Sequence, residues 1–227
     1  MGAARYHPPD PPTNGPADRR PRVMADASLL GAVALGVFVV WHVLRYAAAG
    51  FGRAPLADPD PDGGSALLLS ALLVWLPLGV HTAVGLRQSA RWALQPRDGG
   101  ERTRILHHLA GGITLLFLIY HVVTARLPLL TGERVRAEVP SELYATLSST
   151  TDWGIPAEAL LYLVGLLATV FHLSYGVELA CLRWGLARSA RGVRRLRLAC
   201  AGAGVALFLV GAATVVHFAT GTGPSAY

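Results

Sequence analysis

The sequence contains no lysine and few charged residues of any kind. Its 227 residues include 20 arginines and 14 acidic residues, so that 15% are charged and 52% are hydrophobic. The mean hydropathy is +0.42. Because soluble globular domains carry about 25% charged residues, this composition excludes an ordinary soluble enzyme and is typical of a membrane protein.

Cysteine is also scarce. Only Cys181 and Cys200 are present, and no C-x-x-C-H sequence occurs, which excludes a covalently attached c-type haem. Both cysteines lie near helix ends that we predict to be cytoplasmic, where thiols stay reduced, so we expect no disulfide. The pI is near 9.9, but no nucleic-acid-binding motif accompanies it. We therefore expect arginine contacts with membrane lipid and no nucleic acid partner.

Five long apolar runs provide the main structural signal. Each is close to or above the ~17–25 residues that cross the hydrocarbon core of a bilayer as a helix. They are apolar on all faces, which argues against amphipathic helices lying on the membrane surface. The runs are Ser28–Leu44, Ser65–Leu86, Ile105–Ala125, Ala159–Val177 and Leu198–Thr220. The sequence predicts an all-α membrane protein whose residues 28–220 form a five-transmembrane-helix bundle.

Arginine is unevenly distributed among the segments that flank these runs. Residues 1–27, 87–104 and 183–197 hold fifteen arginines, and the alternating segments hold five. Because arginine accumulates on the cytoplasmic side, we predict a cytoplasmic N-terminus. Residues 1–27 are rich in proline and polar groups, which predicts a disordered cytoplasmic tail. Residues 221–227 would form a short tail on the outer side.

Four histidines lie inside the apolar runs at matched depths. His42, His81, His121 and His172 each follow a helix start by 14 to 16 residues, which places them ~21–24 Å along their helices. Successive helices cross in opposite directions, so the first and third histidines share a level in the outer half. The other two share a level in the inner half. Two facing imidazoles at one level are the geometry of a bis-histidine b-type haem. The sequence therefore predicts two haems, with these four histidines as iron ligands.

Small and cationic residues near these histidines suggest further contacts with a cofactor. Gly85 and Gly176 follow the inner histidines by four residues, where a missing side chain leaves room for a macrocycle or a neighbouring helix. Arg45 and Arg126 follow the outer histidines and could pair with haem propionates. The alternative is that these arginines extend to the lipid headgroups.

The other polar residues at the helix ends have two interpretations each. His107 and His108 begin the third run and would be interfacial, or would hydrogen-bond haem propionates or a quinone. We keep His108 as a candidate cofactor-binding residue. Asp60 and Asp62 are either part of a solvated turn or proton exchangers near a quinone. Pro77, four residues before His81, predicts a kink in the second helix, which either tunes the angle of this histidine or is an ordinary irregularity of a membrane helix.

Several segments together resemble those of a known family, the cytochrome b membrane anchor of di-haem succinate:quinone oxidoreductases and fumarate reductases. The resemblance covers roughly residues 28–185 and implies five helices. It also implies that His81 and His172 bind the haem nearer a cytoplasmic iron–sulfur subunit, and that His42 and His121 bind the distal haem. The matching segments are "SLLG" (28–31), "VVWHVL" (39–44), "LPLGVHTAVG" (76–85), "GITLLFLIYHVVTAR" (112–126), "LVGLLATVFHLSYG" (163–176) and "RWG" (183–185).

The function that this resemblance implies is electron transfer between an iron–sulfur subunit and a membrane quinone, for which menaquinone is the expected type. Succinate or fumarate would be handled by a separate flavoprotein subunit that carries FAD, and no catalytic side chain is assigned in this chain. Two alternatives stay open. One is a di-haem quinol-oxidising cytochrome b subunit of another respiratory complex, of the nitrate reductase or hydrogenase type. The other is a non-redox, histidine-lined membrane transporter, which the scarcity of acidic residues within the runs disfavours.

Overall fold

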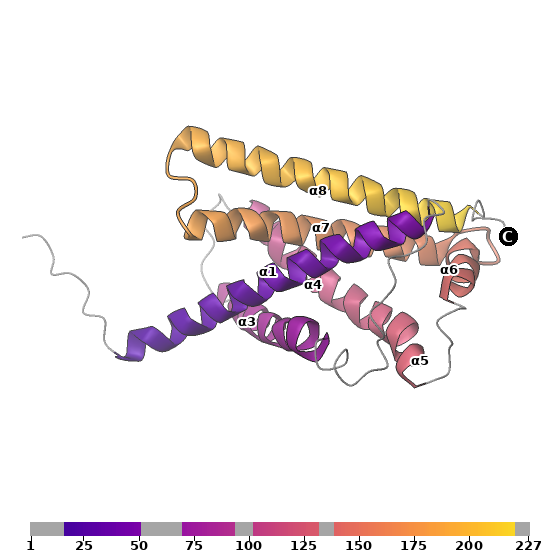
Figure 1. Cartoon of the computed structure of the whole chain (residues 1–227), viewed down its shortest axis with the longest axis horizontal. Coiled ribbons are helices and arrows are strands. Elements are labelled where there is room, and N and C mark those ends of the chain that lie inside the picture. Colours follow the sequence, from indigo (N-terminus) through magenta and orange to yellow (C-terminus); the bar gives the residue numbers. More distant parts are fainter. Residues whose placement is uncertain (1–15, 51–69, 94–101, 132–138, 221–227) are drawn as a thin grey trace, which may run out of the picture.

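The computed structural model describes residues 16–50, 70–93, 102–131 and 139–220 (Figure 1). Within these ranges its regular elements are all helices. Four helical segments are long and apolar enough to cross a membrane, namely Ser28–Ala48, Arg102–Ala125, Ala157–Arg183 and Ala190–Ala219. The chain is an all-α, multi-pass membrane protein. The elements are α1 (Pro16–Gly50), the π-helix η1 (Ala71–Trp75), α3 (Leu76–Ala93), α4 (Arg102–His121), the π-helix η2 (Val122–Arg126), α5 (Leu127–Leu130), α6 (Val139–Ser148), α7 (Ala157–Arg183) and α8 (Ala190–Ala219).

The second predicted span is helical but is not among these four. Residues 70–93 form η1 and α3, whereas residues 65–69 of the apolar run lie outside the described residues. The last two turns of α3 contain Arg87 and Arg91, which make this helix less apolar than the others. A total of five membrane-spanning helices is therefore not confirmed and stays a prediction.

Helix α1 begins earlier than the sequence predicts. It starts at Pro16, so residues 16–27, which we predicted to be part of a tail, are helical. Proline is favourable in the first turn because its fixed φ suits a helix, and the alanine, arginine and methionine that follow are good helix formers. Residues 1–15 and 221–227 of the predicted tails lie outside the described residues.

Each π-helical segment stands directly before a Leu–Pro step. Leu76 and Pro77 follow η1, and Leu127 and Pro128 follow η2. In both segments the leucine N–H bonds the carbonyl five residues back, instead of four. Proline has no N–H, and its ring clashes with the carbonyl four residues earlier, so a wider turn relieves both problems. The structure thus places a π-helical turn directly before Pro77, where we predicted a kink.

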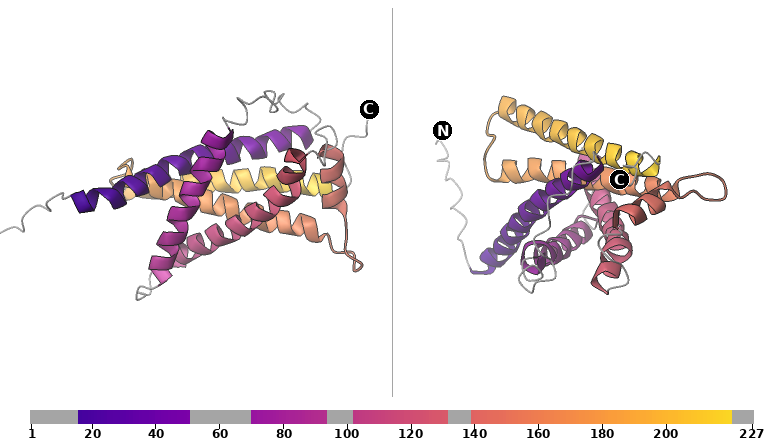
Figure 2. Two further views of the ribbon diagram at one scale, coloured as in Figure 1. Left: turned by 90° about the horizontal axis from the view of Figure 1, so that it is seen from below. Right: turned by 45° about the vertical axis from the view of Figure 1, so that its right-hand side comes forward.

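Helix α7 is the centre of the molecule. It packs against α4 on one side and against α8 on the other, while α1 packs against α3 and α8. The start of α1, the start of α4 and the turn between α7 and α8 lie toward one end, on the left in Figure 1. Figure 2 shows the same arrangement from two other sides. The described parts of the arginine-rich segments that we predicted to be cytoplasmic (16–27, 87–93, 102–104 and 183–197) thus lie toward the same end.

The sequence did not predict helix α6, which packs against α7 and α8 at the opposite end. Its Leu147 is only 1% exposed and forms a core cluster with Ala159, Val215 and Phe218. Isolated helices of ten residues are marginal in water. The burial of Leu147 is therefore what holds α6 in place.

An ion pair with a buried carboxylate and an exposed guanidinium joins α7 to α8. The Nε of Arg197 donates to Oε1 of Glu178 over 3.0 Å. The Glu178 side chain is 6% exposed and the Arg197 side chain 66% exposed. The carboxylate is therefore enclosed between the two helices, while the guanidinium keeps access to the surface.

Gly165 permits the close approach of α7 to α4, because a Cβ at this position would overlap the ring of Phe117. We expect Gly165→Ala to lower the free energy of unfolding by about 1–3 kcal/mol, as overpacking does. Thermal unfolding of the purified protein in detergent measures this change. Gly202→Ala on α8 is the control, since its Cβ would meet no atom within 4 Å. Equal melting temperatures for the two variants would contradict the close contact.

Candidate haem-binding site

The structure brings the four intramembrane histidines together as two pairs. His42 of α1 lies beside His121 of α4, with ring centroids 5.9 Å apart and ring planes at 85°. His81 of α3 lies beside His172 of α7, with a separation of 6.0 Å and an angle of 74°. We call these the outer pair and the inner pair. The spatial pairing predicted from helix depth is therefore present, and the role of these residues as iron ligands stays a prediction.

The separation within each pair suits a shared iron. An imidazole nitrogen lies about 2 Å from a metal ion that it binds, so two axial imidazoles on one iron place their ring centroids roughly 6 Å apart. Within the described ranges, no group of three or more histidine, cysteine, aspartate or glutamate side chains gathers as a metal site. Haem iron needs only two ligands from the protein, whereas a structural zinc site needs four. The arrangement fits haem better than a bare metal ion.

The hydrogen bonds of the inner pair define which ring nitrogen is available. Nδ1 of His172 lies 3.3 Å from the carbonyl oxygen of His107. A carbonyl only accepts, so this Nδ1 carries the proton and donates, which leaves the lone pair on Nε2. Nδ1 of His81 lies 3.3 Å from the hydroxyl of Ser28 on α1. Both inner imidazoles are thus held through Nδ1 by a residue of another helix.

The outer pair is held partly in the same way. Nδ1 of His121 lies 3.2 Å from the hydroxyl of Tyr162 on α7. His42 packs against two rings of its own helix, with centroid distances of 5.5 Å to Phe38 and 4.8 Å to Tyr46. Three of the four histidines therefore have Nδ1 engaged across a helix interface. This is the arrangement that orients histidines that bind a metal through the other nitrogen.

The ring of His172 packs against helix α4. The His107 ring stacks on it with a centroid distance of 4.3 Å and an angle of 4°. One turn further along α4, a Cβ at Gly111 would lie 2.9 Å from Cε1 of His172. Nδ1 of His107 and Oγ1 of Thr114 are buried without a hydrogen-bond partner. Such atoms are expected to have a partner, and a polar group of a bound cofactor would satisfy them.

Both of the predicted glycines have space where a side chain would lie. A Cβ at Gly85 would meet no atom within 4 Å, and one at Gly176 would meet only Cε1 of His107, at 4.0 Å. His108 instead links α4 to α3, because its Nδ1 lies 2.9 Å from the hydroxyl of Ser89. Whether these residues contact a cofactor stays a prediction.

Of the two predicted arginines, the structure describes the side chain of Arg45 and not that of Arg126. The guanidinium carbon of Arg45 lies 5.2 Å from the ring centroid of Trp41, one turn earlier on α1. This is a cation–π contact near the outer pair. The side chain of Arg126 lies outside the described residues, and so do Asp60 and Asp62.

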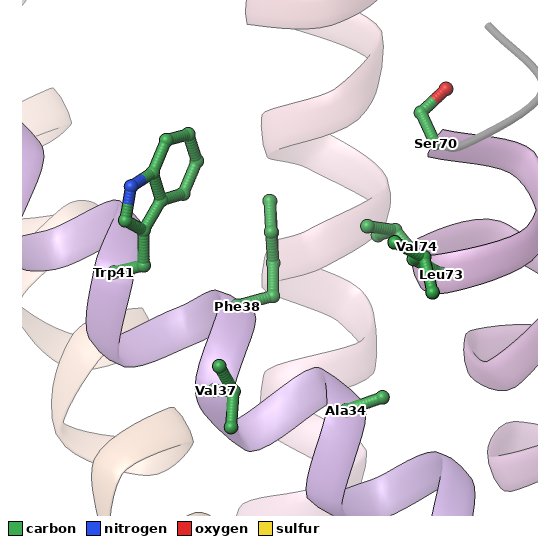
Figure 3. Close-up of a pocket in the computed structure, with 7 residues that line it drawn as sticks. All are labelled: Ala34, Val37, Phe38, Trp41, Ser70, Leu73 and Val74. Atoms are coloured by element: carbon green, nitrogen blue, oxygen red, sulfur yellow. The ribbon is translucent and has the colours of Figure 1, made fainter. Parts of the chain in front are cut away.

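A shallow apolar groove of about 450 Å³ lies between α1 and η1. Trp41 and Phe38 of α1 form one wall, and the η1 segment forms the other (Figure 3). Phe38 also packs against His42, with ring centroids 5.5 Å apart, so one wall of the groove contacts the outer pair. Its lining contains no ionisable side chain and suits an apolar chain. The lining residues are Ala34, Val37, Phe38, Trp41, Ser70, Leu73 and Val74.

Two contacts between α4 and α7 were missed by sequence reasoning. The Tyr120 hydroxyl donates to the Glu158 carboxylate, and Tyr162, one turn after Glu158, contacts His121. The position of Tyr162 along its helix could have predicted its contact with His121. It follows Pro156 by six residues, or ~9 Å along the helix, which is the level of His121. The side chain that accepts from Tyr120 could not be inferred from one sequence.

The chain is similar to a bacterial cytochrome. The relative is the succinate dehydrogenase cytochrome b558 subunit of Bacillus subtilis (strain 168), with 29% identity over 179 residues, 74% of this chain and 81% of the relative. No family model matches the chain, and no solved structure matches it.

Proposed function

We propose that the chain is the di-haem cytochrome b anchor subunit of a succinate:quinone oxidoreductase in a bacterial cytoplasmic membrane. The observation that carries the proposal is the pairing of His42 with His121 and of His81 with His172. The name of the Bacillus subtilis relative supports both the cytochrome and the complex to which it would belong.

In this proposal each histidine pair holds one b haem through Nε2. The bound haems supply one-electron transfer between an iron–sulfur protein and a quinone. The protein's own contribution is orientation. Ser28, the His107 carbonyl and Tyr162 fix the imidazole rings, while the apolar helices exclude water from the pairs. Arg45, Arg126 and His108 are proposed to contact the haem propionates.

The partners follow from the distribution of charge and of histidines. We propose that an iron–sulfur subunit binds the arginine-rich end, at residues 87–104 and 183–197, with a flavoprotein carrying FAD beyond it. The inner pair would then be the first electron partner, because tunnelling requires short gaps. A quinone, with menaquinone as the expected type, would react near the outer pair, and the apolar groove beside Trp41 suits its tail.

Purification of the tagged chain from its own membrane tests this function. We expect two b haems per chain in a pyridine haemochrome assay, because four ligands form two pairs. A flavoprotein and an iron–sulfur protein should co-purify, and succinate should reduce an added quinone.

Other outcomes would lead to different conclusions. One haem or none per intact chain would contradict the assignment of four ligands. Co-purification with a molybdenum enzyme or a hydrogenase would favour another respiratory complex and leave the haem assignment standing. A colourless preparation would favour the histidine-lined transporter.

A further inference from the structure

Tyr162 is placed to act on one haem site and not on the other. Its hydroxyl lies 3.2 Å from Nδ1 of His121, and the two rings meet almost edge to face, at 79° and 5.7 Å. The inner pair uses a serine hydroxyl and a backbone carbonyl for the same purpose. The outer pair uses a phenol hydroxyl in this position instead.

Packing fixes the position of the Tyr162 ring. The ring of Phe117 packs against it with a centroid distance of 5.3 Å, and also stacks on the ring of His121 with a centroid distance of 5.8 Å. Tyr162 additionally packs against the core cluster that contains Leu147 and Phe218. The hydroxyl is therefore held in place by neighbours on several helices, and its hydrogen bond to His121 costs little further ordering.

The direction of this hydrogen bond follows from the pairing. With Nε2 of His121 directed to an iron, Nδ1 carries the proton and donates to the Tyr162 oxygen. A hydrogen bond accepted from Nδ1–H makes the imidazole a more basic ligand. A more basic axial ligand stabilises ferric over ferrous iron and so lowers the reduction potential.

We propose that Tyr162 is a positioning residue that holds His121 in its ligating orientation and lowers the reduction potential of the outer haem site. This inference rests on the proposed function. It gives the outer site a control that is independent of the inner site, so that the potential difference along the electron path can be changed by one side chain.

Redox titration of the purified complex, followed by optical absorption, tests the proposal. The Tyr162→Phe variant keeps the ring and removes the hydroxyl. We expect both haems to be retained, and only the component that is lost in His121→Ala to shift to higher potential. The ratio of reduced to oxidised haem at a fixed potential should rise by up to about tenfold, equivalent to about 59 mV for a one-electron couple. The low-spin EPR signal of the same haem should change as the imidazole loses its fixed orientation.

Tyr144→Phe is the matched control. Tyr144 packs against the same core cluster, so its variant makes the same chemical change in the same region and should leave both potentials unchanged. Should Tyr162→Phe fail to assemble, 3-fluorotyrosine at position 162 keeps the side chain and weakens the oxygen as an acceptor. It should raise the same potential by a smaller amount.

An unshifted outer potential in the variant that assembles, or an equal shift of both haems, would overturn this inference. These results differ from a failure of the proposed function. Retention of both haems in His121→Ala would contradict the ligand assignment itself, whereas an unshifted Tyr162→Phe variant with two haems would leave that assignment intact.

Discussion

Alanine at His81 or at His172 is expected to remove one haem from the chain, and the same haem in both cases. The two imidazoles lie 6.0 Å apart and would share one iron, so the loss of either destroys the same site. Alanine at His42 or His121 should remove the other haem for the same reason. Redox-resolved optical spectra of the four variants would show complete loss of one of two components.

His217→Ala is the control for this series, because His217 lies on α8 outside both pairs. Methionine at the four positions separates loss of a ligand from loss of the fold. Since methionine can also bind haem iron and raises its potential, these variants should keep the haem and shift its potential upward. Loss of different spectral components from His81→Ala and His172→Ala would refute the pairing.

Valine at Gly111 is expected to abolish the inner haem site alone. Even a Cβ at this position would lie 2.9 Å from Cε1 and 3.1 Å from Nδ1 of His172, and valine adds two methyl groups. The imidazole of His172 must therefore move away from α4 and lose its hydrogen bond to the carbonyl of His107. The spectrum of Gly111→Val should contain the outer component and lack the inner one.

The neighbouring glycine is a close control for this prediction. Gly112 is exposed, and a Cβ there would meet no atom within 4 Å. Gly112→Val makes the same change in the same helix turn and should keep both haems. Retention of the inner component in Gly111→Val, or its loss in Gly112→Val, would contradict the close contact between Gly111 and His172.

The sequence was sufficient for most of the helices and for the histidine pairs, because both follow from one-dimensional quantities. The length of an apolar run predicts a membrane-spanning helix, and the number of residues from the start of each helix predicts the depth of a histidine in the membrane. His42 and His121 could therefore be paired from their positions along the chain alone. The pairing required only that histidines at the same level face one another within the bundle.

The remaining features depend on packing that a single sequence does not reveal. Helix α6 is held by Leu147 against α7 and α8, and ten residues carry too little propensity to predict it. The hydrogen bond between Tyr162 and His121 requires the rotation of α7 relative to α4 as well as the depth of both residues. The early start of α1 at Pro16 was missed because proline and polar residues are also typical of disordered segments.

The enclosed Glu178 bears on how this chain would enter a membrane during synthesis. A lone charge in an inserting helix costs free energy, at most about 2.5–3.5 kcal/mol when it lies at the helix centre. Glu178 lies toward the end of α7, with its carboxylate enclosed by protein. Its partner, Arg197, is translated nineteen residues later, in the second turn of α8. Helix α7 alone would present an unneutralised carboxylate to the translocon. We therefore expect α7 and α8 to enter the bilayer together as a helical hairpin. The ion pair between Glu178 and Arg197 would form as the two helices leave the translocon.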